Sequence, residues 1–136
     1  MKPRRIAIAI IIKDDKILIG KKPEIKHPAN MGGMWHFPGG KIEKNEQPEE
    51  AVIREIKEET NLDIKIIEKF QKVNLFTINN IQAEMHFFLC KPITMDLKQG
   101  SDLEKVKWVD KKEVLNNLNP VFVSWLTDEV IDYLNK

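Results

Sequence analysis

The sequence has little cysteine, no long hydrophobic run and no excess of either charge. Cys90 is the only cysteine among the 136 residues, which excludes an internal disulfide framework and a zinc site built from several cysteines. No stretch approaches the ~20 apolar residues that a membrane-spanning helix needs. The 22 basic and 21 acidic residues leave a formal net charge of +1. We therefore expect no membrane and no nucleic-acid polymer as partner, and a reducing, cytoplasmic location.

Internal repeats, low-complexity tracts and shifts of composition are also absent, which predicts a single domain over residues 1–136. Apolar residues make up 42% and charged residues 32%, a balance that supports a buried core and does not favour disorder. The apolar run Ile6–Ile12 follows a basic start and superficially resembles a signal segment. It is short and ends at the charged residues 13–16, so we interpret it as a buried first strand.

Alternating and apolar segments predict a strand-rich chain with turns at Asp14-Asp15 and Asn79-Asn80. We expect Pro23–Met34 to be an irregular loop, Pro38-Gly39-Gly40 to interrupt regular structure, and the tail from Lys111 to form one short and one longer helix. The expected strands are Arg5–Lys13, Lys16–Lys22, Trp35–Phe37, Leu62–Val73, Ile81–Cys90 and Lys105–Val109.

One helix is predicted over Pro48–Thr60. Pro48 suits the first helical position, Glu49 and Glu50 favour the positive N-terminal end, and Asn61 can end the helix in the left-handed conformation. The apolar residues expected to dock this helix on a sheet are Val52, Ile53 and Ile56.

Three carboxylates, those of Glu55, Glu58 and Glu59, share one face of the predicted helix. They repel one another and, near the C-terminal end, oppose the helix dipole. A solvated acidic face is one interpretation. A bound divalent cation is the other, because Mg²⁺ or Mn²⁺ prefers carboxylate and carbonyl oxygens. Arg54 can pair with Glu46 or Glu55 and fix their rotamers.

The spacing of these residues forms a specific motif. Gly40 is followed after five residues by Glu46, and after seven more by Arg-Glu-Ile-Lys-Glu-Glu-Thr-Asn-Leu from Arg54. This resembles the Nudix box, Gx5Ex7REUxEExGU with U aliphatic, at every position except the final glycine, where Asn61 stands. Asparagine also tolerates the left-handed conformation. Segments 35–40 and 102–109 are similar to the family's flanking sequences, so the resemblance covers nearly the whole chain.

The resemblance implies an α/β (α+β) Nudix fold, with a mixed β-sheet sandwiched between helices. It also implies cleavage of a nucleoside diphosphate linked to another moiety, with Mg²⁺ or Mn²⁺ as cofactor. By the same resemblance, Glu55, Glu58 and Glu59 are metal ligands together with the Gly39 carbonyl, while Glu46 and Arg54 orient them. The carboxylates implied as the general base are Glu55, Asp102 and Glu104, and the choice among them stays open; for Asp102 and Glu104 an ordinary loop acid is the alternative.

Substrate contacts are implied for two lysines and two further polar residues. Lys21 and Lys22 align with basic residues that hold non-reacting phosphates in MutT-type members; a solvated strand end is the alternative. His36 lies beside the Pro-Gly-Gly segment and is expected to contact the substrate. The alternative is a structural role, which is more common for a lone histidine. Asn119, before a proline, is similar to a base-reading asparagine of some members.

Markers of several subfamilies are missing. The window around Ile78, about sixteen residues beyond the box, has neither the proline of ADP-ribose-cleaving members nor the tyrosine of diadenosine-polyphosphate-cleaving members, and the coenzyme A signature is absent. The leading prediction is a MutT-like hydrolase of a (d)NTP that releases pyrophosphate, acting as a monomer or homodimer. The alternatives are an ADP-ribose, nucleotide-sugar or dinucleotide-polyphosphate hydrolase and a non-catalytic nucleotide sensor.

Overall fold

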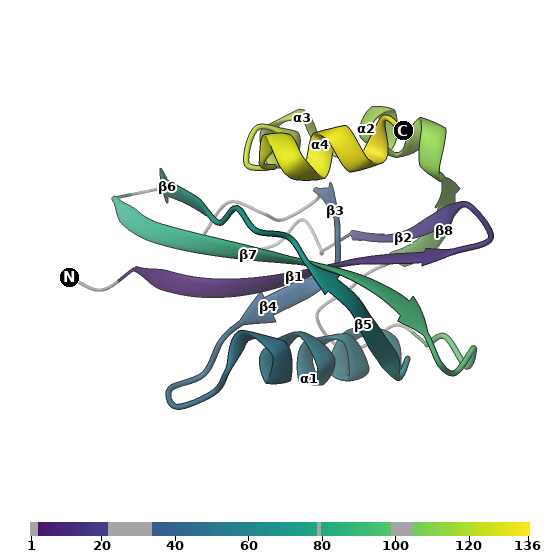
Figure 1. Ribbon diagram of the computed structural model, residues 1–136, viewed down its shortest axis with the longest axis horizontal. Coiled ribbons are helices and arrows are strands. Elements are labelled where there is room, and N and C mark those ends of the chain that lie inside the picture. The colour runs from purple at the N-terminus through teal and green to yellow at the C-terminus, as the bar shows by residue number, and fades with distance from the viewer. Residues whose placement is uncertain (1–2, 22–33, 79, 99–104) are drawn as a thin grey trace.

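The computed structural model describes residues 3–21, 34–78, 80–98 and 105–136. Within these ranges the chain forms a mixed β-sheet with helices on both sides (Figure 1). In chain order the elements are β1 (Arg4–Lys13), β2 (Lys16–Lys21), β3 (Trp35–His36), β4 (Gly39–Lys41), α1 (Pro48–Thr60), β5 (Ile64–Lys69), β6 (Asn74–Ile78), β7 (Ile81–Pro92), β8 (Lys105–Asp110), the 3₁₀ turn η1 (Lys111–Glu113), α2 (Val114–Asn117), α3 (Pro120–Val123) and α4 (Asp128–Leu134).

The sheet is organised around β1. Its strand order is β3-β2-β1-β7-β5, with β4 also paired to β1, β6 to β7 and β8 to β2. β1 runs parallel to β7 over the eight pairs from Arg4↔Ala83 to Ile11↔Cys90, and antiparallel to β2 and β4. Figure 1 shows α1 below the sheet and α2, α3 and α4 above it. This layered α+β arrangement confirms the predicted fold class.

Each face of the sheet has its own hydrophobic core, because successive side chains of a strand point to opposite faces. Along β1, Ile8 and Ile10 pack with residues of α2, α3 and α4, whereas Ala7, Ala9 and Ile11 pack with α1. β7 is buried on both faces as well: Met85, Phe87 and Leu89 pack in the same core as Ile8 and Ile10, whereas Phe88 and Cys90 pack on the α1 side.

The turn between β1 and β2 lies where the sequence predicts it. Asp14 and Asp15 have φ values of 51° and 62°, and two consecutive positive φ values suit the tight turn that matches the twist of a hairpin.

α1 has the predicted bounds. Asn61 follows it with φ 65° and ψ 6°, and its backbone N–H donates to the Lys57 carbonyl. The expected apolar face is wrong at one position: Val52 and Ile56 are fully buried, but Ile53 is 44% exposed, because at about 100° per residue it lies a quarter of a turn or more away from Val52 around the helix.

Three strand predictions need correction. Gly39 and Gly40 do not interrupt regular structure but form β4, because their backbone pairs with Ile8 and Ala7 of β1. Phe37 lies beyond the end of β3. The segment Leu62–Val73 is not one strand: β5 has a register shift between Ile66 and Glu68, and a separate strand, β6, begins at Asn74.

The C-terminal tail also differs from its prediction. It contains η1 and three short helices instead of one short and one longer helix. Pro120 begins α3 at a position where the preceding Asn119 is extended, with ψ 134°, as residues before proline prefer. Among the described residues, no helix is long and apolar enough to cross a membrane.

Candidate functional site

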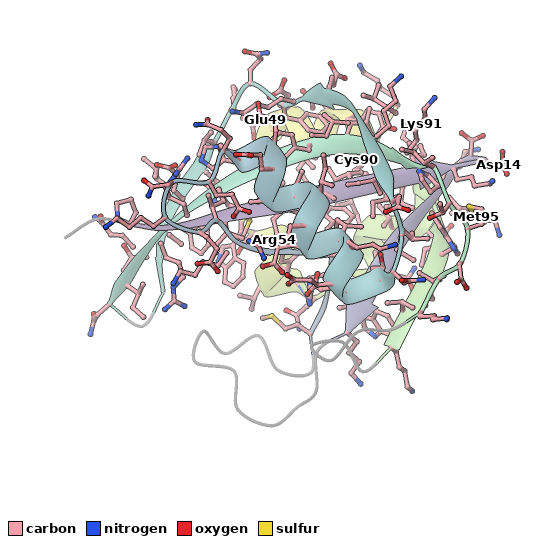
Figure 2. The ribbon with its side chains drawn as sticks, turned by 90° about the horizontal axis from the view of Figure 1, so that it is seen from below. Asp14, Glu49, Arg54, Cys90, Lys91 and Met95 are labelled. Atoms are coloured by element: carbon pink, nitrogen blue, oxygen red, sulfur yellow. The ribbon has the colours of Figure 1, made fainter. Side chains whose placement is uncertain are left out.

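The motif residues lie on β4, on α1 and on the loop that joins them. β4 is held in the sheet by β1, and α1 packs across both strands. In Figure 2, viewed from the α1 side, Glu49 marks the first turn of the helix and Arg54 lies further along it. The glycines of β4 and the glutamates of α1 are therefore brought together by two elements that both pack against β1.

Arg54 is the centre of a hydrogen-bond network. Its Nε and Nη2 donate to the two carboxylate oxygens of Glu46 at 2.8 and 2.9 Å, a bidentate pairing that fixes both side chains. Nη2 also donates to the Lys41 carbonyl at 3.0 Å. Nη1 donates to Glu55 at 3.0 Å and to Glu58 at 3.3 Å. Arg54 thus pairs with both of the partners that the sequence offered, Glu46 and Glu55, and with two further groups.

Glu46 is an anchor of this network. Hydrogen bonds from Arg54 and, to a lesser extent, from the backbone N–H of Glu43, 2.9 Å from Glu46 Oε1, together lower the pKa of Glu46 from 4.5 to about 2. The same pairing raises the pKa of Arg54. A carboxylate with so low a pKa is a poor proton acceptor near neutral pH, so Glu46 suits the orienting role and not that of a general base.

The carboxylate of Glu55 lies directly over Gly40. A Cβ on Gly40 would overlap the Glu55 carboxylate carbon and Oε2 and lie 2.8 Å from Oε1. Gly40 is therefore needed for space and not for an unusual φ. The Glu55 side chain is only 12% exposed, and Arg54 holds it from the other side.

Glu59 is the buried member of the acidic face. It is 2% exposed, and its Oε1 accepts the backbone N–H of Gly39 at 2.9 Å. Gly39 in turn sits against β1 so closely that a Cβ there would overlap the Ala7 carbonyl oxygen. The last turn of α1 is thus tied to β4, and the Gly39 group that faces Glu59 is its N–H.

Glu58 is the exposed member, with 57% of its side chain accessible. Among the described residues, no three His, Cys, Asp or Glu side chains gather closely enough to hold a metal ion. The physical reason is visible in the contacts: Arg54 lies between Glu55 and Glu58, and Glu59 is turned toward Gly39. The oxygen-rich donor set still fits Mg²⁺, which commonly takes one or two carboxylates and completes its shell with waters and substrate phosphates.

Lys21 and His36 lie on neighbouring strands. Lys21 is half-buried at the end of β2, in register with Trp35 of β3 and Lys105 of β8. His36 is 1% exposed, its Nδ1 lies 2.7 Å from the Phe37 carbonyl oxygen, and its ring lies 5.8 Å from that of Phe122. A carbonyl only accepts, so Nδ1 carries the proton of this contact. His36 is a core residue here, and its contact with substrate stays a prediction.

Asn119 lies beside β3. Its backbone N–H donates to the Trp35 carbonyl at 3.0 Å, and its Oδ1 accepts the N–H of Val121 at 2.8 Å, capping α3. The structure therefore places Asn119 next to the strand of His36, with its side-chain oxygen engaged in the cap. Lys22, Asp102 and Glu104 lie outside the described residues, as does most of the expected loop Pro23–Met34.

Three site features have no signal in the sequence. The Lys41 carbonyl and the Gly39 N–H are backbone groups, which any residue carries. The side chain of Asn61 donates to the Asp96 carbonyl at 2.9 Å, a contact between residues 35 positions apart. Motif spacing describes one continuous segment and so carries no information about such partners.

Known proteins resemble this chain in sequence and in fold. A family model described as "NUDIX domain" matches residues 2–127. A Proteus vulgaris protein named 8-oxo-dGTP diphosphatase is 44% identical over 64 residues, which cover 46% of this chain and 54% of that protein. The CTP pyrophosphohydrolase of Escherichia coli is 35% identical over 66 residues, covering 48% and 47%. The chain thus spans about half the length of these two relatives.

A third relative matches over a longer stretch. The ADP-ribose pyrophosphatase of Methanocaldococcus jannaschii is 35% identical over 113 residues, which cover 80% of this chain and 60% of that protein. Among solved structures, the MutT protein of Methanosarcina mazei superposes with a TM-score of 0.81 at 24% identity, covering 99% of this chain and 97% of that chain. At that identity the superposition establishes the fold alone.

Proposed function

This chain belongs to the Nudix family, and we propose that it is a Mg²⁺- or Mn²⁺-dependent pyrophosphohydrolase that cleaves a nucleoside triphosphate to the monophosphate and pyrophosphate. The observation that carries the proposal is the network in which Arg54 joins Glu46 and Glu55 above Gly40. This network holds the Glu55 carboxylate in a fixed position. Two further acids lie on the same helix: Glu58, which is exposed, and Glu59, which accepts the backbone N–H of Gly39. The proposal includes a small nucleotide as ligand and a cytoplasmic location.

The electrostatics of the site favour a cation together with a polyphosphate. The carboxylates of Glu46, Glu55 and Glu58 all contact the guanidinium of Arg54, so the formal charge there is negative, and Glu59 adds a fourth carboxylate to the same helix. An anionic substrate alone would be repelled. Over residues 43–59 seven acids face three bases, a balance of −4, and the rest of the chain carries +5. This distribution attracts a divalent cation to α1 and leaves basic residues elsewhere for phosphate groups.

The proposed roles of the site residues are as follows. Glu55 and Glu58 would hold the ion, with Glu59 completing the acidic face; a bound Mg²⁺ neutralises phosphate charge and lowers the pKa of a coordinated water. Arg54 restrains the Glu55 carboxylate, and Glu46 restrains Arg54. Three carboxylates are candidates for the general base: Glu55, which lies among the described residues, and Asp102 and Glu104, which do not. Lys21 and Lys22 are proposed to bind the non-reacting phosphates, and His36 and Asn119 to lie near the base.

A second candidate is an ADP-ribose or related nucleotide-sugar hydrolase. The match to the Methanocaldococcus jannaschii ADP-ribose pyrophosphatase favours it, because that match extends over 113 residues. The missing proline near Ile78 speaks against it. A sensor that binds nucleotide without turnover is less well supported, since all three glutamates of the acidic face are present.

The test is a substrate panel with products resolved by mass. Purified protein with Mg²⁺ is incubated with dGTP, 8-oxo-dGTP, CTP and ADP-ribose. Monophosphate plus pyrophosphate supports the leading proposal, whereas AMP plus ribose phosphate supports the alternative. Metal-dependent binding without turnover across the panel indicates a sensor, and neither binding nor turnover contradicts all three.

Glu58→Gln provides the matching site variant. It removes one charge and retains the side-chain shape, so we expect it to lose activity with an unchanged fold. Glu49→Gln is the control, because Glu49 is an exposed glutamate on the first turn of the same helix (Figure 2). Equal activity of the two variants would contradict a catalytic role for the acidic face.

A further inference from the structure

The side chain of Asn61 joins the end of α1 to a distant segment. Its Nδ2 donates to the Asp96 carbonyl at 2.9 Å and lies 3.4 Å from the Asp96 carboxylate. Its backbone has φ 65°, a conformation that glycine adopts without strain. The helix stop alone therefore does not require a side chain at this position, and the amide contact is a separate property of asparagine.

The segment Ile93–Lys98, which follows β7, lies along the residues just after α1. The N–H of Lys98 donates to the Thr60 carbonyl at 2.8 Å, and the N–H of Ile93 donates to the Asp63 carbonyl at 2.7 Å. The N–H of Asp63 donates to Thr94 Oγ1 at 3.0 Å. The Asn61 contact lies in the middle of this series and joins the two stretches of chain at their centre.

Polar contacts carry most of this attachment. The side chains of Ile93 and Met95 are 65% and 49% exposed, and those of Asp96 and Lys98 are about 70% exposed. Only Leu97 packs, in part, against the core on the α1 face. Because little apolar surface is buried here, removal of a hydrogen bond changes the attachment more than it would in a packed region.

The attached turn of α1 is the one that carries the acidic face. Thr60, whose carbonyl accepts the Lys98 N–H, follows Glu59 directly, and Glu59 reaches back to the Gly39 N–H. The last carbonyls of a helix have no hydrogen-bond partners within the helix. When no group outside the helix donates to them, the last turn frays. Fraying at Thr60 and Asn61 would release Glu59 and Glu58 from their present positions.

We propose that Asn61 is a positioning residue: its carboxamide fixes the segment Ile93–Lys98 to the end of α1 and thereby holds Glu58 and Glu59 in place for metal binding. The metal-binding part rests on the proposed function. The positioning of Glu59 does not rest on the proposed function. The Gly39 N–H donates to the Glu59 carboxylate, so its hydrogen exchange measures that position directly.

Asn61→Gly tests this inference cleanly. Glycine retains the left-handed backbone and removes only the amide. Asn80→Gly is the matched control, because Asn80 also has a positive φ, 63°, in an exposed turn, and its side chain makes no hydrogen bond within the described ranges. Both variants change the entropy of the unfolded chain in the same way.

Two measurements follow the position of the glutamates. The first is amide hydrogen exchange of Gly39 and Lys98 by NMR, on the full chain. The second is the dissociation constant of Mn²⁺ by electron paramagnetic resonance, with Mn²⁺ alone as the probe. We expect Asn61→Gly to speed both exchange rates and to weaken Mn²⁺ binding by about three- to tenfold, the equivalent of one hydrogen bond, while Asn80→Gly leaves both near the wild-type values.

Unchanged Gly39 exchange in Asn61→Gly would overturn the proposal, even if Lys98 exchange were faster. An unchanged Mn²⁺ dissociation constant with faster Gly39 exchange would overturn its metal-binding part. Absence of Mn²⁺ binding by the wild-type protein would instead contradict the proposed function, and the exchange data would still decide whether Asn61 positions Glu59.

Discussion

Gly40→Ala should separate activity from stability. The added Cβ would overlap the Glu55 carboxylate carbon and Oε2 and lie 2.8 Å from Oε1. Ordinary contacts between such atoms begin near 3.5 Å, so the carboxylate has to move by roughly 1 Å. A displacement of about 1 Å in a catalytic group lowers turnover on the order of 100-fold. We therefore expect kcat to fall by about that factor.

The same variant should fold normally. The obstructing atoms are the end of a flexible side chain and not backbone, and the backbone of Gly40 has no positive φ. Replacing glycine with alanine at such a position reduces the entropy of the unfolded chain and adds about 0.4–1 kcal/mol of stability. The free energy of unfolding, measured with urea, should stay within about 1 kcal/mol of the wild-type value.

Gly39→Ala is the matched control, because it makes the identical change one residue earlier. There the added Cβ would overlap the Ala7 carbonyl oxygen and lie 2.8 Å from the Ile8 Cα, both backbone atoms of β1. Neither can yield without moving the strand, so we expect a loss of about 1–3 kcal/mol in the free energy of unfolding. Wild-type kcat in Gly40→Ala, or a larger loss of stability there than in Gly39→Ala, would refute the reasoning.

Two further predictions concern the Arg54 network. Arg54→Lys replaces a planar fork by one ammonium, which cannot reach Glu46, Glu55 and the Lys41 carbonyl together, so urea unfolding should show a loss of about 1–2 kcal/mol; an unchanged midpoint would contradict this. The pKa of Glu46 is lowered from 4.5 to about 2 by hydrogen bonds from Arg54, so its stabilising contribution is complete above pH 4.5 and is lost as the pH falls toward 2. The difference in unfolding free energy between wild type and Glu46→Gln should shrink over that interval, and a difference independent of pH would exclude the pairing as its source.

Local features of the sequence predicted α1 and the turn between β1 and β2 well, whereas Asn79 of the other expected turn lies outside the described residues. Pro48 and Asn61 mark the ends of α1 because each has a backbone preference that does not depend on distant residues. Asp14 and Asp15 tolerate positive φ for the same kind of reason. The acidic face of α1 was predictable from helical geometry, since three residues of one continuous segment define it.

Features that depend on distant partners were not predictable. Gly39 and Gly40 form a strand only because β1 is there to pair with them, and Ile53 is 44% exposed although its neighbour Val52 is fully buried. The three glutamates look alike in the sequence, yet Glu59 is buried and Glu58 exposed. Their environments are set by the tertiary position of β4 and not by their spacing.

The central position of β1 has a consequence for how the chain folds. Its parallel partner is β7, and Arg4 pairs with Ala83, 79 residues later. Parallel pairing over such a separation raises contact order and slows folding. During synthesis the apolar stretch 6–12 can pair early with β2 and β4, but the edge that β7 occupies stays unpaired until residues 81–92 have emerged. Arg4, Arg5 and Lys13 flank it, and charges at such positions act as gatekeepers against aggregation. We expect their replacement by neutral residues to lower the yield of folded protein more than its final stability.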